Sequence, residues 1–251
     1  MKVLITGASS GIGRELARLL APRCSLLILA GRNTERLEAL REELAVRPDL
    51  LVVTEAEDLD RPENCVSLHA AWPDVDLLVN NAGFGDFGPF AETALDKELR
   101  MIDTNIRAMH ILMKLYLKDM VKRDSGQILN VASIAGFFPG PLMATYYATK
   151  AYVVRLSEAV RRELKARGSR VRISILCPGP VATGFEKTAN IAFHFRGADA
   201  RETAAYALAH LDRFYIVPGL PFQAARLLAG AVPASAAAAA VYLLQSRRTR
   251  E

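Results

Sequence analysis

The chain has 251 residues, of which 51% are hydrophobic and 24% charged, and its formal net charge is +5 at pH 7. This length fits one compact domain over 1–251, and the composition is that of an ordinary globular protein. Basic residues are scattered except between Arg155 and Arg170 and in the tail SRRTR, and no aromatic residues are interleaved with them. We therefore expect no nucleic-acid partner.

Cysteine and histidine are few and widely spaced. The three cysteines, Cys24, Cys65 and Cys177, form no CxxC pair, which favours reduced thiols in a cytoplasmic protein over a disulfide framework. The amino terminus, MKVLITGAS, lacks the long apolar stretch of a signal peptide, so none is expected. No metal site is predicted, because metal-ligand spacing is lacking among His69, His110, His194 and His210.

Short apolar runs alternate with amphipathic helical stretches along most of the chain. Near-continuous apolar strands separated by helices predict an α/β fold, a Rossmann-like doubly wound parallel sheet of about seven strands with helices on both faces. Ligands bind such sheets beyond the carboxyl ends of the strands. In chain order we expect strands at 2–6, 25–31, 49–56, 75–83, 126–133, 171–179 and 214–219, and helices at 11–20, 33–46, 95–122 and 144–166.

The turn after the first strand is rich in glycine. It reads TGASSGIG over 6–13, with glycines at Gly7, Gly11 and Gly13. Glycine permits a tight turn and close backbone approach, and the helix that follows presents free N–H groups and its positive end to a pyrophosphate. Because the turn follows a strand and opens a helix, it predicts a dinucleotide site.

The end of the second strand should set the choice of dinucleotide. An acidic residue there would bond to the ribose 2′-OH of NAD. This chain has Ala30-Gly31-Arg32-Asn33 instead, so no carboxylate repels a phosphate and a guanidinium lies close by. We expect NADP to be preferred, although Arg32 also has the simpler interpretation of a surface residue that starts the next helix.

Tyr146 and Lys150 are four residues apart on the predicted helix 144–166. They therefore share one helix face, whereas the neighbouring Tyr147 has no lysine at that spacing and should face the core or an interface. A nearby ammonium stabilises phenolate, which would lower the tyrosine pKa towards the range useful for acid–base catalysis. Alone, this spacing is common on solvated helices.

Further polar residues fall at or near predicted strand ends. Asn80-Asn81-Ala82-Gly83 ends the fourth strand, Ser133 the fifth, and Pro178-Gly179 the sixth, with Thr183 beyond it. Asn105 lies in the helix between the fourth and fifth strands.

Together these motifs resemble those of the short-chain dehydrogenase/reductase family over residues 1 to about 185. The matching elements are TGxxxGIG at 6–13, NNAG at 80–83, Asn105, Ser133, YxxxK at 146–150 and PG at 178–179.

The resemblance implies an NADP(H)-dependent oxidoreductase that interconverts a ketone or aldehyde and an alcohol. Tyr146 is implied as general acid or base, Lys150 as the group that lowers its pKa and binds the nicotinamide ribose, Ser133 as a hydrogen-bond donor to substrate, and Asn105 as part of a proton relay. The implied cofactor residues are Gly7, Ser9, Ser10, Gly11, Ile12, Gly13, Arg32, Asn33, Asp58, Leu59, Asn81, Ala82, Gly83, Tyr146, Lys150, Pro178, Gly179 and Thr183.

Two segments should shape the substrate site. Phe137, Phe138, Leu142 and Met143 suggest an apolar pocket, or packing against a lid or second subunit. Residues 184–212 are expected to form a lid that orders on substrate binding.

The apolar segment 222–245 is interrupted by Arg226 and Pro233, which favours two packed C-terminal helices over a membrane helix. The resemblance implies a homodimer or homotetramer through 95–122 and 144–166, and the first of these is rich in apolar residues (Ile102, Ile106, Met109, Ile111, Leu112, Leu115 and Tyr116).

Other functions stay open at this point. The chain could sense NADPH without catalysis, although both Tyr146 and Lys150 are present. It could also be a membrane-peripheral reductase of lipid ketones, tethered by 222–245. Dehydratase or epimerase chemistry occurs in related folds, but the Ser133, Tyr146 and Lys150 set favours simple redox.

Overall fold

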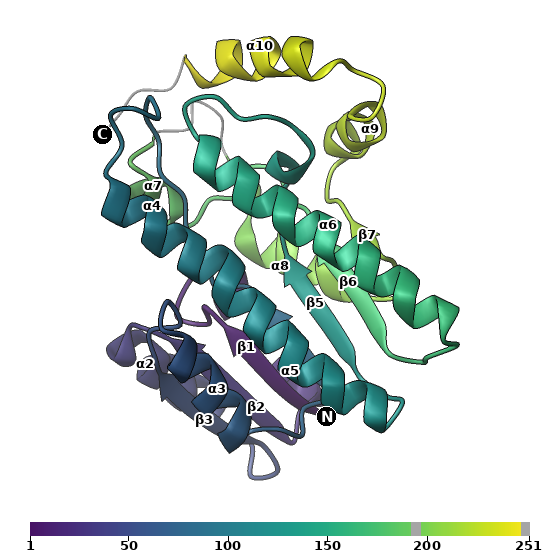
Figure 1. The fold of residues 1–251 in the computed structure, drawn as a ribbon. Coiled ribbons are helices and arrows are strands. Elements are labelled where there is room, and N and C mark those ends of the chain that lie inside the picture. Colours follow the sequence, from purple (N-terminus) through teal and green to yellow (C-terminus); the bar gives the residue numbers. More distant parts are fainter. Residues whose placement is uncertain (192–196, 247–251) are drawn as a thin grey trace.

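The computed structural model describes residues 1–191 and 197–246 (Figure 1). Its strands form one parallel sheet in the order β3-β2-β1-β4-β5-β6-β7, which confirms the predicted doubly wound α/β fold. The strands are β1 (Lys2–Thr6), β2 (Leu26–Gly31), β3 (Leu51–Ala56), β4 (Leu77–Asn80), β5 (Gln127–Val131), β6 (Arg172–Leu176) and β7 (Tyr215–Ile216).

Helices cover both faces of this sheet. Alternate side chains of β1 enter different cores, with Val3 and Ile5 on one face and Leu4 on the other. Because both faces are covered, the strands read in the sequence as near-continuous apolar runs. One face carries α1 (Gly11–Leu20), α2 (Thr34–Leu44) and α8 (Ala200–Ala209), and the other carries α3 (Pro62–Ala71), α5 (Met109–Lys122) and α6 (Ala144–Ala166).

The predicted helix 95–122 is present as three consecutive pieces. They are α4 (Leu95–Ile102), a turn of π-helix at Asp103–Ala108, and α5. Asn105 lies in the π-turn, where its Oδ1 accepts a hydrogen bond from Phe84 N at 3.0 Å and its Nδ2 donates to Phe84 O at 2.9 Å. This amide therefore ties the π-turn to the loop after β4.

Several strands end earlier than the sequence predicts, and β4 shows the reason. Its pairing stops at Asn80, because the next two backbone N–H groups, of Asn81 and Ala82, donate to the Thr6 hydroxyl at 3.0 Å each. The chain leaves the sheet there and lines the space beyond the strand ends.

The segment 184–212, which the sequence analysis expects to form a lid, lies only partly at the surface. α7 (Phe185–Ala189) lies in its first part, but Thr203, Ala204 and Ala207 of α8 are buried, and α8 packs in the same apolar core as α1. A helix that completes the core is not part of a mobile cover, so the lid prediction was wrong for 200–209. Residues 192–196 of that segment, including His194, lie outside the described residues.

At the carboxyl end of the chain, α9 (Leu220–Leu228) and α10 (Ala234–Gln245) flank Pro233, which caps α10. Figure 1 shows both helices, in yellow, beyond the end of the sheet towards which the strands point. None of the helices in the described ranges is both long and apolar enough to cross a membrane. All three cysteines are buried and unpaired.

Candidate active site

A cavity of about 1280 Å³ lies beyond the carboxyl ends of the strands. It begins at the β1–α1 turn, passes the ends of β2 to β6, and continues to α6, α7, α9 and α10. Of the predicted site residues, the lining includes Gly7, Ser9, Ser10, Gly11, Ile12, Arg32, Asn33, Asp58, Leu59, Asn81, Ala82, Gly83, Ser133, Tyr146, Lys150, Pro178, Gly179 and Thr183.

Two predicted site residues, Gly13 and Asn105, are not part of this lining. A Cβ on Gly13 would lie 2.4 Å from Gly7 O, so this glycine allows α1 to pack closely against the turn. Asn105 is buried, and both hydrogens of its amide are engaged, by Phe84 O and by Thr149 Oγ1 at 3.1 Å. Its side chain therefore supports the cavity wall and has no N–H left to donate to a relay.

The turn before α1 is built to receive an anion. Gly7 has φ +66°, a left-handed conformation that glycine adopts without strain. Ser10 caps α1 in an extended conformation, and its side chain makes no cap hydrogen bond. The first N–H groups of α1 are thus left for a ligand at the positive end of the helix.

Asn81 fixes this turn against the neighbouring strand. Its Nδ2 donates to Thr6 O at 2.9 Å and to Gly7 O at 3.2 Å, while its own N–H donates to the Thr6 hydroxyl. The ends of β1 and β4 are joined by these bonds, so the glycine turn is held in place before any ligand arrives.

At one extreme of the cavity, the end of β2 presents positive charge. Arg32 is exposed, with its guanidinium carbon 5.9 Å from the centre of the Phe84 ring. Asn33 caps α2, since its Oδ1 accepts from Arg36 N at 2.8 Å. Arg36 also lines the cavity and was missed from the sequence, although its position four residues after Arg32 at the start of a predicted helix was the available signal.

The end of β3 completes this extreme. Asp58 and Leu59 line the cavity as predicted, and Glu57, which was not predicted, lines it beside them. Leu59 is buried, and the Asp58 carbonyl accepts a hydrogen bond from Asn64 Nδ2 at 3.0 Å. The site therefore has an apolar floor at Leu59.

Lys150 is buried in the middle of the cavity wall. Its Nζ donates to Val131 O, the last residue of β5, at 2.9 Å and lies 5.8 Å from the centre of the Tyr146 ring. Burial lowers the pKa of Lys150 to about 8, because the charged ammonium is disfavoured away from water.

The pKa of Tyr146 is shifted in the direction opposite to the sequence-based interpretation. Burial of the phenol raises its pKa above the ordinary value, and a hydrogen bond with Ser133 opposes that rise only partly. The Lys150 ammonium is bound to Val131 O and lies over the ring, so in this arrangement the expected lowering by Lys150 is not seen. Tyr146 is consequently a phenol that keeps its proton at neutral pH.

Ser133 lies where β5 ends, next to Tyr146. Its Oγ accepts a hydrogen bond from Ala135 N at 3.1 Å and is 3.4 Å from Pro178 O. The second distance is long for a hydroxyl donor. The Ser133 hydroxyl hydrogen can therefore turn to a better acceptor in the cavity.

Tyr147 packs against a small apolar cluster that includes Phe87 and Met143, as expected, but it is not directed away from the cavity. It lines the same cavity, and its ring centre is 6.2 Å from that of Tyr146. Gln245 Nε2 in α10 donates to the Tyr147 hydroxyl at 2.8 Å. The second tyrosine thus connects α6 to the C-terminal helix, a role that only the tertiary structure reveals.

The other extreme of the cavity is apolar. Phe138 and Met143 line it as predicted, but Phe137 packs on Tyr215 and the core, and Leu142 packs on a small cluster around Phe87. Side chains that the sequence did not single out complete this apolar wall: Val181, Phe185, Phe222, Val232, Ala236, Ala237, Ala240, Val241 and Leu244.

α7 covers this apolar extreme. The Phe185 ring is centred 5.2 Å from the Tyr146 ring, and a Cβ on Gly85 would lie only 2.7 Å from Phe185 Cζ. Lys97 holds the helix from outside, since its Nζ donates to Thr188 O at 2.9 Å and to the buried Asp86 carboxylate at 2.7 Å. A single lysine thereby ties α7 to the loop after β4.

The family model for short chain dehydrogenases matches residues 1–192. The chain belongs to this short-chain dehydrogenase/reductase family. Like the relatives named below, it is an oxidoreductase.

Named relatives and solved structures of the family agree with this fold. The NADP-dependent 3-hydroxy acid dehydrogenase YdfG of Escherichia coli O6:H1 is 34% identical over 210 residues, which cover 82% of this chain and 81% of the relative. A short-chain dehydrogenase from Sphingobium yanoikuyae, solved with NADPH, is 31% identical with a TM-score of 0.84 and 92% of each chain covered. One from Burkholderia phymatum, solved with NAD, is 28% identical with a TM-score of 0.78, covering 90% of this chain and 92% of that one.

The cavity of this short-chain dehydrogenase fits a nicotinamide dinucleotide. The free first turn of α1 and the left-handed Gly7 suit a pyrophosphate, and Arg32 and Arg36 at one extreme suit an added phosphate. No group of three or more potential metal ligands occurs in the described part of the chain.

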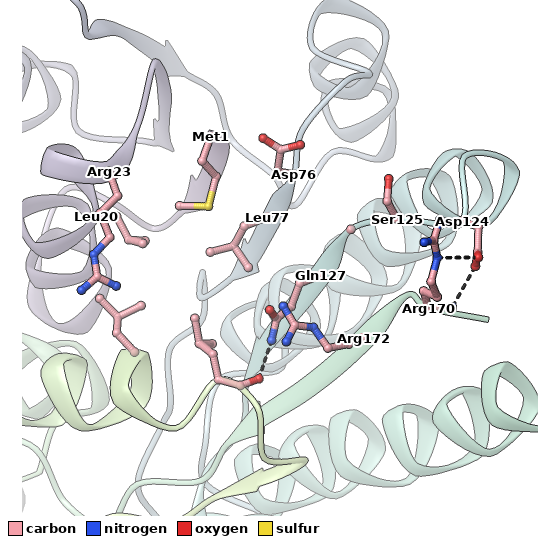
Figure 2. Close-up of a pocket in the computed structure, with 13 residues that line it drawn as sticks. Met1, Leu20, Arg23, Asp76, Leu77, Asp124, Ser125, Gln127, Arg170 and Arg172 are labelled. Atoms are coloured by element: carbon pink, nitrogen blue, oxygen red, sulfur yellow. Dashed lines mark hydrogen bonds and ion pairs between the residues drawn. The ribbon is translucent and has the colours of Figure 1, made fainter. Parts of the chain in front are cut away.

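A second hollow, of about 680 Å³, lies at the amino ends of the strands (Figure 2). Arg170 in its lining bonds to Asp124, and Gln127 Nε2 donates to Leu211 O at 2.6 Å. Since none of the predicted catalytic or cofactor residues lines it, we assign it no part in the redox chemistry.

Proposed function

We propose that this enzyme interconverts an uncharged, apolar ketone or aldehyde and the corresponding alcohol, with NADP(H) as its cofactor. The observation that carries the proposal is the lining of one cavity by Ser133, Tyr146 and Lys150 together with the glycine turn of α1. The three side chains thus face the space in which a carbonyl would meet the cofactor.

When bound, NADPH supplies the hydride for reduction and NADP⁺ accepts it in oxidation. The chain's own residues handle the charge and the proton. As negative charge grows on the substrate oxygen, the Ser133 hydroxyl donates a hydrogen bond to it and Tyr146 releases its proton to it. A phenol that stays protonated at neutral pH is suited to this acid role in reduction.

Lys150 and Asn105 support the chemistry in different ways. We propose that Lys150 binds the nicotinamide ribose, and that its ammonium, now bonded to Val131 O and 5.8 Å from the centre of the Tyr146 ring, turns towards the phenolate once the proton has been transferred. Asn105 acts as a positioning residue, because its amide fixes the backbone at Phe84, next to Gly83 in the cavity wall.

A preference for NADP over NAD is supported by charge at the end of β2. Arg32 and Arg36 both line the cavity there, where a 2′-phosphate would add negative charge. Glu57 and Asp58 also line this extreme, and one structural neighbour was solved with NAD, so the preference must be measured.

An apolar substrate is supported by the lining near Tyr146. Apart from Lys150, the charged residues that line the described cavity lie at the ends of β2 and β3, on the opposite side (Arg32, Arg36, Glu57 and Asp58). Among the described residues, a substrate carboxylate would meet no arginine beside Phe138, Met143 and Phe185. We therefore propose that the substrate differs from the 3-hydroxy acids named for the relative from E. coli.

The α4–α6 side is proposed as the interface of a homodimer or homotetramer. Leu95 and Leu99 of α4 are 67% and 49% exposed, and Tyr152 of α6 is also exposed. Of the apolar residues that the sequence analysis counted in 95–122, Met109, Leu112 and Tyr116 are buried in the core. Light scattering that gives the mass of one chain would contradict the interface.

A panel of ketones and aldehydes tests the proposed reaction. We expect an aryl alkyl ketone and a long-chain ketone to be reduced with a higher kcat/KM than a 3-oxo acid of similar length, and NADPH to outperform NADH at least about tenfold. If NADPH binds, as measured by its fluorescence, but no carbonyl accelerates its oxidation, the chain is a cofactor sensor and not a reductase.

A further inference from the structure

The helices α9 and α10 form one wall of the cavity and also its outer rim. Ala237 of α10 lines the cavity and is buried. Val232 and Leu244 line it as well, yet they are 40% and 56% exposed. Apolar side chains of this segment therefore belong both to the cavity wall and to the outer surface of the molecule.

That outer surface carries large apolar side chains in water. Within the described residues, seven of the fifteen exposed large hydrophobic side chains fall in the 25 residues from 220 to 244. Exposed large apolar side chains gathered on two consecutive helices indicate an interaction site. We call this surface the α9–α10 face; its members are Leu220, Leu227, Leu228, Val232, Tyr242, Leu243 and Leu244.

The charge of this part of the chain is mainly positive. From Phe214 to Glu251 the sequence contains four arginines, Arg226, Arg247, Arg248 and Arg250, and one acidic residue, Glu251. Three of these arginines lie outside the described residues, and in the sequence they follow directly on the apolar end of α10. An apolar surface followed in the sequence by arginines complements anionic lipid, which offers an apolar phase and negative headgroups together.

The two helices are also lightly attached to the rest of the molecule. α9 has no fully buried residue, and α10 has two, Ala237 and Gln245. Gln245 bonds to the Tyr147 hydroxyl at 2.8 Å and approaches Met143 Sδ at 3.6 Å. The rim of the cavity is therefore attached to α6 beside Tyr146. Anything that binds to the outer side of α9 and α10 would lie over the cavity entrance.

We propose that the α9–α10 face docks on an anionic lipid surface and that the cavity takes its carbonyl substrate from that lipid. The docking stands on the exposed surface and its charge, whereas the source of the substrate rests on the proposed reductase function. We favour lipid over a second copy of the chain. A protein bound on Val232 and Leu244 would block the entrance of the cavity, whereas a lipid phase there would present the substrate to it. The separate apolar residues of α4 also leave this face free in an oligomer.

Flotation of the full-length chain with vesicles tests the docking. We expect it to float with phosphatidylcholine vesicles that contain phosphatidylglycerol, and poorly with phosphatidylcholine alone. The variant Leu227→Ser/Leu228→Ser/Leu243→Ser should lose binding at least about tenfold, because each leucine gains by leaving water. None of these three side chains lines the cavity.

A matched variant keeps the test specific. Val46→Ser/Leu51→Ser/Val66→Ser removes three exposed apolar side chains elsewhere (80%, 59% and 51% exposed) and should float like the wild type. Both variants should reduce a small water-soluble ketone within about twofold of the wild-type rate.

Three results would overturn the docking. They are no flotation of the wild type, equal flotation of both triple variants, and a lower mass by light scattering for the leucine variant alone, which would make the face an interface between copies. If flotation is as expected but no carbonyl is reduced, the docking stands, and the proposed function and the substrate source fail.

Discussion

The two extremes of the cavity are held in different ways. At the cofactor extreme, the Thr6 hydroxyl and the Asn81 amide join the ends of β1 and β4 through hydrogen bonds of 2.9 to 3.2 Å. At the substrate extreme, α7 is held by Lys97 and the Phe185 ring, and α10 by Gln245 and Ala237. The first extreme is held by side chains that bond to the backbone at the ends of two central strands, and the second is a cover of short helices fixed by a few side chains.

This difference separates two tasks. A cofactor that is the same in every turnover is best bound by a preformed turn, since the protein then has little of its own chain to order on binding. A cover with few buried contacts opens at low free energy and can change its lining without disturbing the sheet. Changes at the first extreme should therefore alter cofactor use, and changes at the second should alter substrate use.

Among the substitutions that test this comparison, we expect the largest loss of activity at Ser133, which lies between the two extremes of the cavity. Ser133→Ala should lower kcat about 10²- to 10³-fold, because one donor to the developing oxyanion is lost, with little change in NADPH binding. The control is Ser174→Ala, because Ser174 in β6 is also a buried serine but does not line the cavity. Steady-state kinetics that show equal losses in both variants would contradict the role of Ser133.

Next in size is the effect at Arg32. Arg32→Ala should raise the KM for NADPH about 10- to 100-fold and leave that for NADH nearly unchanged, since a charge-assisted bond to phosphate is lost. Arg36→Ala should act in the same direction. Arg41→Ala, on the same helix but outside the cavity, should have no effect. If both coenzymes respond equally to Arg32→Ala, the 2′-phosphate assignment is wrong.

A pH dependence follows from Lys150. Its pKa is lowered to about 8, so the ammonium is lost as pH rises through that value, whereas Tyr146 keeps its proton. We expect kcat/KM for reduction to fall about tenfold between pH 8 and pH 9 or slightly above. Lys150→Arg keeps the charge and should remove this limb if active. A wild-type rate that stays flat up to about pH 10 would exclude the assignment.

The smallest effect is expected at the cover. Lys97→Met removes the bond to Thr188 O and should raise the KM for carbonyl substrates about fivefold, with NADPH kinetics unchanged. The variant also leaves the buried Asp86 carboxylate without the Lys97 ammonium and should therefore lower Tm. The double variant Asp86→Asn/Lys97→Met should recover Tm but not KM. Recovery of both would mean that Lys97 stabilises the fold without holding α7.

The cofactor half of the molecule could be predicted from sequence because its signals are local. Each strand is an apolar run in the sequence. Gly7, Arg32 and Asn81 directly follow β1, β2 and β4, so the topology of the sheet alone places them at the cavity. Arg36 could have been added by helical spacing. The early end of β4 could not, because it depends on Thr6, 75 residues away.

The substrate half could not be predicted in the same way, because it is held by few contacts and these join residues that are far apart in the sequence. The sequence analysis placed α8 in the lid 184–212, yet Ala204 and Ala207 are buried in the core that α8 shares with α1. The Tyr147–Gln245 bond joins residues 98 apart. The pKa of Tyr146 depends on burial by surrounding elements, and a Tyr-x-x-x-Lys spacing carries no information about that burial.

The most direct measurement is the turnover of Tyr146→Phe beside that of Tyr147→Phe, with the best carbonyl substrate and saturating NADPH. The two changes each remove one hydroxyl from adjacent residues of the same cavity wall. We predict that Tyr146→Phe lowers kcat about 10²- to 10⁴-fold while NADPH still binds, and that Tyr147→Phe stays within a few-fold of wild type. Near-normal turnover of Tyr146→Phe, or equal losses in both variants, would contradict the proposed chemistry.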